Sequence, residues 1–179
     1  MKIIETGLKG CKIIEPKVYK DERGLFLETF QVQRYKVEAD IDNVFLQDNF
    51  STSVEGVLRG LHYQKTKPQG KLVRVTRGKV FDVAVDIRRH SSTYGKWNGL
   101  ELSDKNKLQL WIPPGFAHGF LVLSKEADFE YKCTQYYDPN DEGAILWNDR
   151  DLRIDWPKLN NIIISDKDAK GIGFRDLNL

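Results

Sequence analysis

Long apolar runs are missing from this sequence. No uninterrupted apolar run exceeds four residues, and residues 120–123 form one of the longest. A membrane-spanning helix needs about 20 apolar residues in succession, and a secretory signal needs an apolar core behind a basic start. Because the sequence has neither, we expect a cytoplasmic protein without a membrane partner.

Excess charge of one sign is missing as well. Twenty-eight Lys and Arg residues against 26 Asp and Glu residues leave a formal net charge of +2. No run of like charge is long enough for a nucleic-acid tail, so we expect no nucleic-acid partner and any bound anion in a local pocket.

Cysteine is scarce too: Cys11 and Cys133 are too few for a disulfide scaffold and too far apart for a short metal knuckle. We expect both to be buried, reduced thiols.

What the sequence does contain is enough for one domain over residues 1–179, with 40% hydrophobic side chains to build a core. Short runs of strict alternation dominate, and Gly, Pro, Asn and Asp punctuate them. The clearest run puts Phe81, Val83, Val85 and Ile87 on one strand face and Asp82, Asp86 and Arg88 on the other. The pattern predicts an all-β protein, an antiparallel β sandwich or jelly roll.

Helix is expected in only two places. Val32, Tyr35 and Ala39 have helical spacing within residues 31–40, and Ser165 could cap a second short helix.

Three histidines occur, and two have informative neighbours. His118 ends residues 113–118 (PPGFAH), which resemble half of the cupin signature. A metal-binding cupin usually has a His-x-His pair, but the residue two positions after His62 is Gln64. We therefore predict no metal site. His118 could also be an ordinary hydrogen-bonded histidine of the interior, and His90 lies in a polar stretch typical of a solvated loop.

His62 could act as a base near neutral pH if a carboxylate held its far ring nitrogen. Spacing alone does not identify that carboxylate. Asp168 is a candidate, yet residues 165–168 (SDKD) also fit a capping box at a helix start. Arg59, Lys65, Lys67, Lys71 and Arg74 surround His62 in sequence and could form a cationic pocket, although Lys65 and Lys67 also suit a solvated loop.

Several segments together resemble the dTDP-4-dehydrorhamnose 3,5-epimerase family. They are residues 21–24 (DERG), 59–64 (RGLHYQ), 69–74 (QGKLVR), 81–88 (FDVAVDIR), 109–120 and 165–169 (SDKDA). The resemblance runs in order from about residue 15 to about residue 169, and residues 170–179 show nothing specific to the family.

This resemblance implies an isomerase with a cupin-type jelly roll, no cofactor and a homodimeric state. Its substrate would be a dTDP-linked 4-keto-6-deoxyhexose inverted at carbons 3 and 5, in the route to L-rhamnose. The matching positions imply His62 as general base with Asp168 as its partner, Tyr131 as general acid and Lys71 beside the keto oxygen. Further substrate contacts would be Arg23, Glu28, Gln47, Asp48, Asn49, Arg59, His118, Glu142 and Lys167.

Arg23 and Arg59 are the natural ligands for the diphosphate. Phe26 and Tyr137 could stack on the thymine base of the nucleotide, because Phe26 shares strand parity with Glu28, and Tyr137 precedes a turn.

The expected chemistry follows from the ketone, which acidifies the C–H bonds on both neighbouring carbons. His62 would remove a proton, Lys71 would stabilise the oxyanion, and Tyr131 would return a proton from the opposite face. Without the resemblance, Tyr131 would be interpreted as a barrel-lining aromatic.

The alternatives to a 3,5-epimerase are an epimerase of carbon 3 or carbon 5 only, a metal-dependent cupin oxygenase, and a sugar-binding jelly roll without catalysis.

Overall fold

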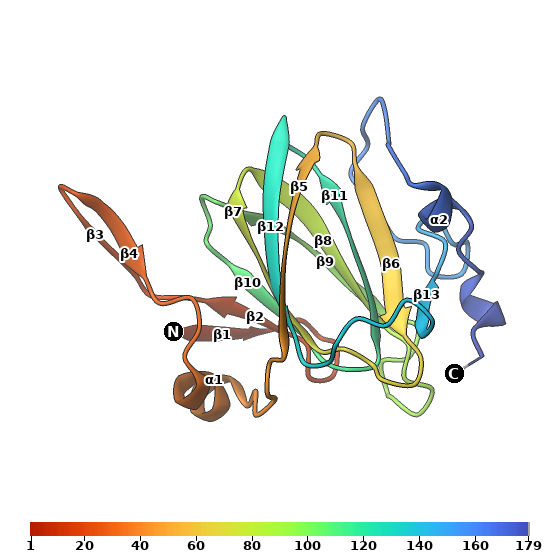
Figure 1. Ribbon diagram of the computed structural model, residues 1–179, viewed down its shortest axis with the longest axis horizontal. Helices are drawn as coiled ribbons and strands as arrows, with labels where there is room; N and C mark the ends of the chain where they lie inside the picture. The colour runs from red at the N-terminus through yellow and green to blue at the C-terminus, as the bar shows by residue number, and fades with distance from the viewer. Residues whose placement is uncertain (179) are drawn as a thin grey trace.

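Two antiparallel sheets face each other in the computed structural model, which describes residues 1–178 (Figure 1). The first sheet has the order β1 (Lys2–Glu5), β2 (Lys12–Glu15), β10 (Gln109–Ile112), β7 (Lys71–Arg77), β12 (Glu126–Cys133) and β5 (Gln47–Val54). The second has the order β13 (Glu142–Ala144), β6 (Leu58–Gln64), β11 (Phe116–Val122), β8 (Lys79–Asp86) and β9 (Trp97–Ser103). The predicted all-β antiparallel sandwich is confirmed.

The second sheet is buried on both faces. Val80 and Ala84 of β8 pack between the sheets, whereas Val83 and Val85 pack on the outer side. There the chain after β13 covers them with a set of apolar side chains: Ile145, Leu152, Trp156 and Leu177. The predicted alternation along β8 is therefore confirmed, but its acidic side lies inside: Asp82 and Asp86 are both 0% exposed.

Both predicted helices are confirmed. In α1 (Val32–Ala39), Tyr35 and Ala39 are buried against the first sheet, and the Tyr35 hydroxyl donates to Gln109 at 2.7 Å. In α2 (Asp166–Ala169), the Ser165 hydroxyl accepts a hydrogen bond from the Asp168 backbone N–H at 3.1 Å. A short 3₁₀ helix, η1 (Phe174–Asp176), follows near the C-terminus. Cys11 and Cys133 are free and buried, as expected.

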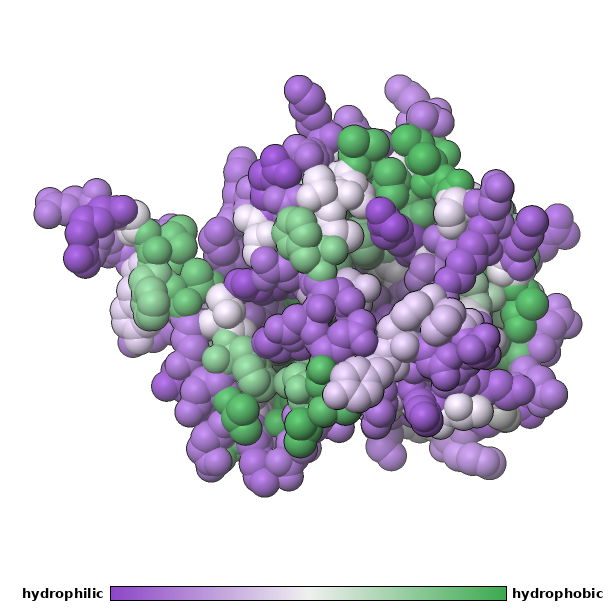
Figure 2. Space-filling view, viewed as in Figure 1, coloured by the Kyte–Doolittle hydropathy of each residue, from purple (hydrophilic) through white to green (hydrophobic). Residues whose placement is uncertain are grey.

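A hairpin of β3 (Val18–Asp21) and β4 (Gly24–Leu27) projects from this body as an arm (Figure 1). Tyr19, Leu25 and Phe26 on the arm are exposed by 52%, 48% and 70%. Figure 2 shows these apolar residues along the arm and hydrophilic ones at its tip. Within residues 1–178, no helix has the length and apolar character needed to cross a membrane.

Candidate active site

A cavity of about 330 Å³ opens between the two sheets. Its size is within the range of small-molecule sites, about 300–1,000 Å³. Gln47 and Asn49 come from β5, Lys71 from β7 and Tyr131 from β12, all in the first sheet. Arg59, His62, His118 and Glu142 come from the second sheet, and Tyr137 lies in the loop before β13. Charged and titratable side chains from two sheets thus converge on one space.

An irregularity in β6 brings two of these side chains to the same face. Residues three apart on a regular strand face opposite sides. In β6, however, His62 pairs with His118 while Arg59 pairs with Phe120, so β6 holds one extra residue, as in a β-bulge. Gly60 lies in this bulge with φ of +105°. Because of the extra residue, both Arg59 and His62 line the cavity.

The His62 ring is held by a carboxylate from α2. Its Nε2 lies 2.6 Å from Oδ1 of Asp168, whose other oxygen accepts the Gly60 backbone N–H at 3.1 Å. Burial raises the pKa of Asp168, but the hydrogen bonds and positive charge of His62, with the Gly60 N–H, outweigh it and leave the pKa lowered. Asp168 is therefore a carboxylate, and Nδ1 of His62 is the nitrogen left for the cavity.

Glu142 stands on the other side of the His62 ring. Its Oε1 lies 3.9 Å from Nδ1 of His62. Its Oε2 accepts a hydrogen bond from the Tyr137 hydroxyl at 2.9 Å and another from Lys167 of α2. The two neighbouring residues Lys167 and Asp168 thereby hold Glu142 and His62, respectively, so α2 is tied to both sides of the His62 ring.

Lys71 and Tyr131 occupy the opposite sheet. The Lys71 ammonium lies 5.9 Å from the centre of the Tyr131 ring. Burial lowers the pKa of Lys71, and nearby Cys133, Glu142 and Asp82 offset this only in part. Burial raises the pKa of Tyr131, although the Arg59 charge opposes the shift. Tyr131 therefore stays protonated at neutral pH and can donate its proton.

His118 forms a second histidine–aspartate pair. Its Nε2 lies 2.9 Å and 3.1 Å from the two carboxylate oxygens of Asp82. Burial lowers the pKa of His118, and the charge of Asp82 only partly compensates. His118 is therefore a neutral imidazole near neutral pH. Phe129 stacks on its ring with 6.0 Å between centroids and, with Phe120, walls this end of the cavity.

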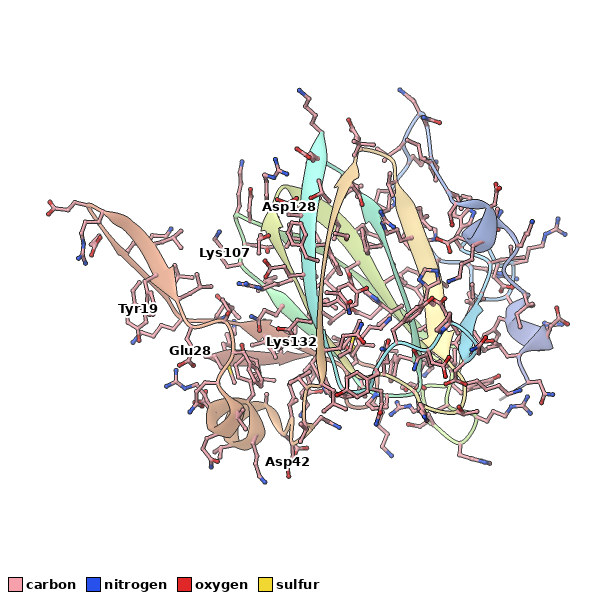
Figure 3. The ribbon with its side chains drawn as sticks, in the orientation of Figure 1. Tyr19, Glu28, Asp42, Lys107, Asp128 and Lys132 are labelled. Carbon is pink, nitrogen blue, oxygen red and sulfur yellow. The ribbon has the colours of Figure 1, made fainter. Side chains whose placement is uncertain are left out.

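Four of the predicted substrate contacts lie elsewhere. Asp48 faces the outer side of its sheet, because β5 alternates and Gln47 and Asn49 face in; it pairs with Lys132 at 2.8 Å. Glu28 pairs with Arg34 at 3.0 Å at the base of the arm. Arg23 and Phe26 lie on the arm itself. Figure 3 shows Tyr19 on the arm and Glu28 at its base, well away from Asp128 on β12.

Six residues that build this site were not predicted from the sequence. Ser51, Gln69, Gly119, Phe120 and Phe129 line the cavity, and Asp82 holds His118. Asp82 carried a signal, since it interrupts an apolar strand, but the sequence does not show that the polar face of that strand is internal. Among residues 1–178, no group of three or more His, Cys, Asp or Glu side chains is placed to hold a metal ion.

Comparison with known proteins gives one consistent family. A family model described as dTDP-4-dehydrorhamnose 3,5-epimerase matches residues 5–176. The protein of that description from Methanothermobacter thermautotrophicus is 55% identical over 169 residues, 93% of this chain and 91% of the relative.

Solved structures that are similar to this chain are also epimerases of dTDP-linked sugars. The dTDP-6-deoxy-D-glucose-3,5-epimerase of Legionella pneumophila, solved in complex with dTDP-4-keto-L-rhamnose, has a TM-score of 0.96 and 55% identity, covering 99% of this chain and 94% of that one. More distant is a 3'-monoepimerase from Streptomyces bikiniensis in complex with dTDP-quinovose. Its TM-score is 0.88 and its identity 30%, covering 94% of this chain and 86% of that one.

Proposed function

The chain belongs to the dTDP-4-dehydrorhamnose 3,5-epimerase family, and we propose that it inverts carbons 3 and 5 of dTDP-4-dehydro-6-deoxy-D-glucose to give dTDP-4-dehydro-L-rhamnose. The observation that carries this proposal is the placement of a base and an acid on opposite walls of one cavity. His62 belongs to the second sheet and Tyr131 to the first. Sheets packed face to face lie about 10 Å apart, which leaves room for a sugar ring between them.

The reaction starts at the base. The ketone at carbon 4 acidifies the C–H bonds of carbons 3 and 5, because the electrons left behind spread onto the keto oxygen. Nδ1 of His62 accepts the proton, while Asp168 holds the proton already on Nε2 and stabilises the imidazolium. Glu142, 3.9 Å from Nδ1, adds a second negative charge beside it.

The negative charge that develops on the keto oxygen needs a cation, and Lys71 supplies it from the opposite sheet. Tyr131 then returns a proton to carbon from the face opposite His62, and this inverts the centre. An oxyanion donor is worth about 3–4 kcal/mol, and a positioned acid or base about 10²–10⁴ in rate. These groups supply a large part of an enzymatic acceleration without a cofactor.

The nucleotide half of the substrate is proposed to lie where two copies of the chain meet. Arg23, Phe26 and Glu28 belong to the arm or its base and lie outside their own cavity. A two-stranded hairpin is marginally stable in water by itself, and exposed apolar patches mark contact surfaces. Both points support a homodimer in which the arm of one protomer reaches the cavity of its partner, with Arg23 and Arg59 near the diphosphate.

The test is to incubate the protein with dTDP-4-dehydro-6-deoxy-D-glucose in heavy water and to locate deuterium in the product by NMR. We expect deuterium at carbons 3 and 5, and none when His62→Asn replaces the base. Exchange at carbon 3 alone or carbon 5 alone would replace the proposal with a single-site epimerase. Binding of the nucleotide sugar without exchange would favour a sugar-binding protein, and turnover that depends on added metal would favour an oxygenase.

A further inference from the structure

Two histidine–aspartate pairs each present their histidine ring to the cavity, and the function proposed above uses only one of them. His62 with Asp168 is the first, and His118 with Asp82 is the second. His62 and His118 are directly opposite each other on the paired strands β6 and β11. Directly opposite residues have Cβ atoms about 4.5–5.5 Å apart. In both pairs the carboxylate binds Nε2, so each ring has Nδ1 left over.

A carboxylate at position 82 is expected to lower the stability of the fold, because it is buried. The Asp82 side chain is 0% exposed, and within residues 1–178 all of its hydrogen bonds are made with His118. A buried carboxylate that replaced a well-packed apolar residue would destabilise the fold unless it were fully paired. Of the other residues on this strand face, Val80 and Ala84 are apolar and packed in the core, and the Asp86 carboxylate is bound by side chains outside the cavity. A purely structural account therefore does not explain why an acid stands here.

The carboxylate fixes the proton of the His118 ring. An imidazole is ordinarily more basic than a carboxylate, so the shared proton resides on Nε2 and is donated to Asp82. Nδ1 then carries a lone pair. Within residues 1–178, Nδ1 of His118 makes no hydrogen bond, yet it is not among the fully buried atoms without a partner, of which Asn98 Oδ1 is the single case. Nδ1 is therefore accessible, and it opens to the cavity that the ring lines.

We infer that Asp82 is a positioning residue that holds His118 with Nδ1 as a hydrogen-bond acceptor for the 3-hydroxyl of the sugar, and that this contact is required for epimerisation at carbon 3. The inference rests on the proposed epimerase function. Of the two carbons beside the ketone, only carbon 3 carries a hydroxyl; carbon 5 carries the methyl group and the ring oxygen. An acceptor nitrogen beside the base therefore distinguishes the two carbons.

The physical effect is orientation. Holding the 3-hydroxyl fixes carbon 3 relative to Nδ1 of His62 on the directly opposite residue, so that its C–H bond points at the base. Carbon 5 has no group for Nδ1 of His118 to hold, and its exchange depends on His62, Lys71 and Tyr131 alone. The His118 pair thus determines which carbons react without itself removing a proton.

The test variant is Asp82→Asn in the full-length protein, with initial rates of deuterium uptake measured separately at carbons 3 and 5. An amide can donate to Nε2, which places the ring proton on Nδ1 and turns the acceptor into a donor. We expect exchange at carbon 3 to fall by about 10²-fold or more while exchange at carbon 5 stays within about threefold. His118→Asn should show the same selective loss.

The matched control is Asp86→Asn. Asp86 lies on the same strand and is equally buried, but it binds Arg88, Ser91 and Thr93 rather than a cavity residue. It should leave the ratio of the two exchange rates unchanged. Parallel loss at both carbons in Asp82→Asn, or no change in the ratio, would overturn the inference. If the unmodified protein exchanges neither carbon, it is the proposed function that fails.

Discussion

In the proposed mechanism, the imidazole of His62 works as a base only while its two nitrogens have different partners. Asp168 holds Nε2 at 2.6 Å, which leaves the lone pair on Nδ1. In Asp168→Asn, the amide can donate to Nε2 and place the proton on the nitrogen that should accept one. We expect kcat to fall by about 10³–10⁴-fold, the scale found when the orienting carboxylate of a catalytic triad is replaced.

Asp166→Asn is the matched control for that variant. Asp166 lies on the same short helix but is exposed, and it should keep near-normal activity. Both variants should bind dTDP with similar affinity, because neither side chain lines the cavity. A fall of less than tenfold in Asp168→Asn would mean that the ring is oriented without this carboxylate.

Lys71 should set the alkaline limit of activity. Burial lowers its pKa from the ordinary lysine value of 10.5, so the ammonium loses its charge at a lower pH than an exposed lysine. The pKa of Tyr131 is raised, so its phenol keeps its proton over the same range. We therefore expect kcat/KM to decline with rising pH, with a midpoint below the ordinary lysine value.

The measurement is a profile of kcat/KM against pH, compared with that of Lys71→Arg. Because a guanidinium keeps its charge beyond pH of about 12, the alkaline decline should disappear in this variant, whatever its absolute rate. A decline with the same midpoint in both proteins would assign it to another group.

At the scale of single elements, the bulge in β6 is the feature on which the site depends most. Gly60 has φ of +105°, and a Cβ atom there would lie 2.5 Å from the backbone oxygen of His118. Gly60→Ala should therefore lower the free energy of unfolding by about 2–3 kcal/mol and remove most of the activity, since Arg59 and His62 flank the bulge.

Gly7→Ala separates backbone strain from crowding. Gly7 has φ of +82°, and a Cβ atom there would have nothing within 4 Å. Gly7→Ala should lower the free energy of unfolding by only about 1 kcal/mol and leave activity intact. Urea unfolding with a parallel activity assay tests both variants. Equal destabilisation by the two substitutions would show that the backbone around His118 moves away from the new Cβ atom without lowering the free energy of unfolding further.

The same bulge marks the limit of what the sequence could predict. Alternation and turn residues predicted the strands, and spacing predicted both short helices, because these are local properties. Parity alone would place Arg59 and His62 on opposite faces, and only the pairing of β6 with β11 shows that they share one. The inward side of Asp82 likewise depends on the chain after β13 covering the outer face, which no local pattern contains.

At the scale of the whole molecule, the proposed site has two parts, the cavity and the arm, which lie apart within one protomer. The cavity lies inside the sandwich, whereas the arm projects from the body and carries exposed apolar side chains (Figures 1 and 2). Within residues 1–178, the Arg23 side chain binds only Asp21, its neighbour on the same hairpin. A site completed by the arm of a second protomer predicts that two different defects can compensate.

Co-expression of Arg23→Ala and His62→Asn chains tests this arrangement. Each variant alone should be nearly inactive, since one lacks an arm cation and the other the base. In a mixed dimer, one cavity with intact His62 receives an intact Arg23 from the partner, and random pairing should restore about a quarter of normal activity. Lys20→Ala, another arm cation, serves as the control and should stay active alone. If the mixture is no more active than its components, the arm serves its own protomer or none.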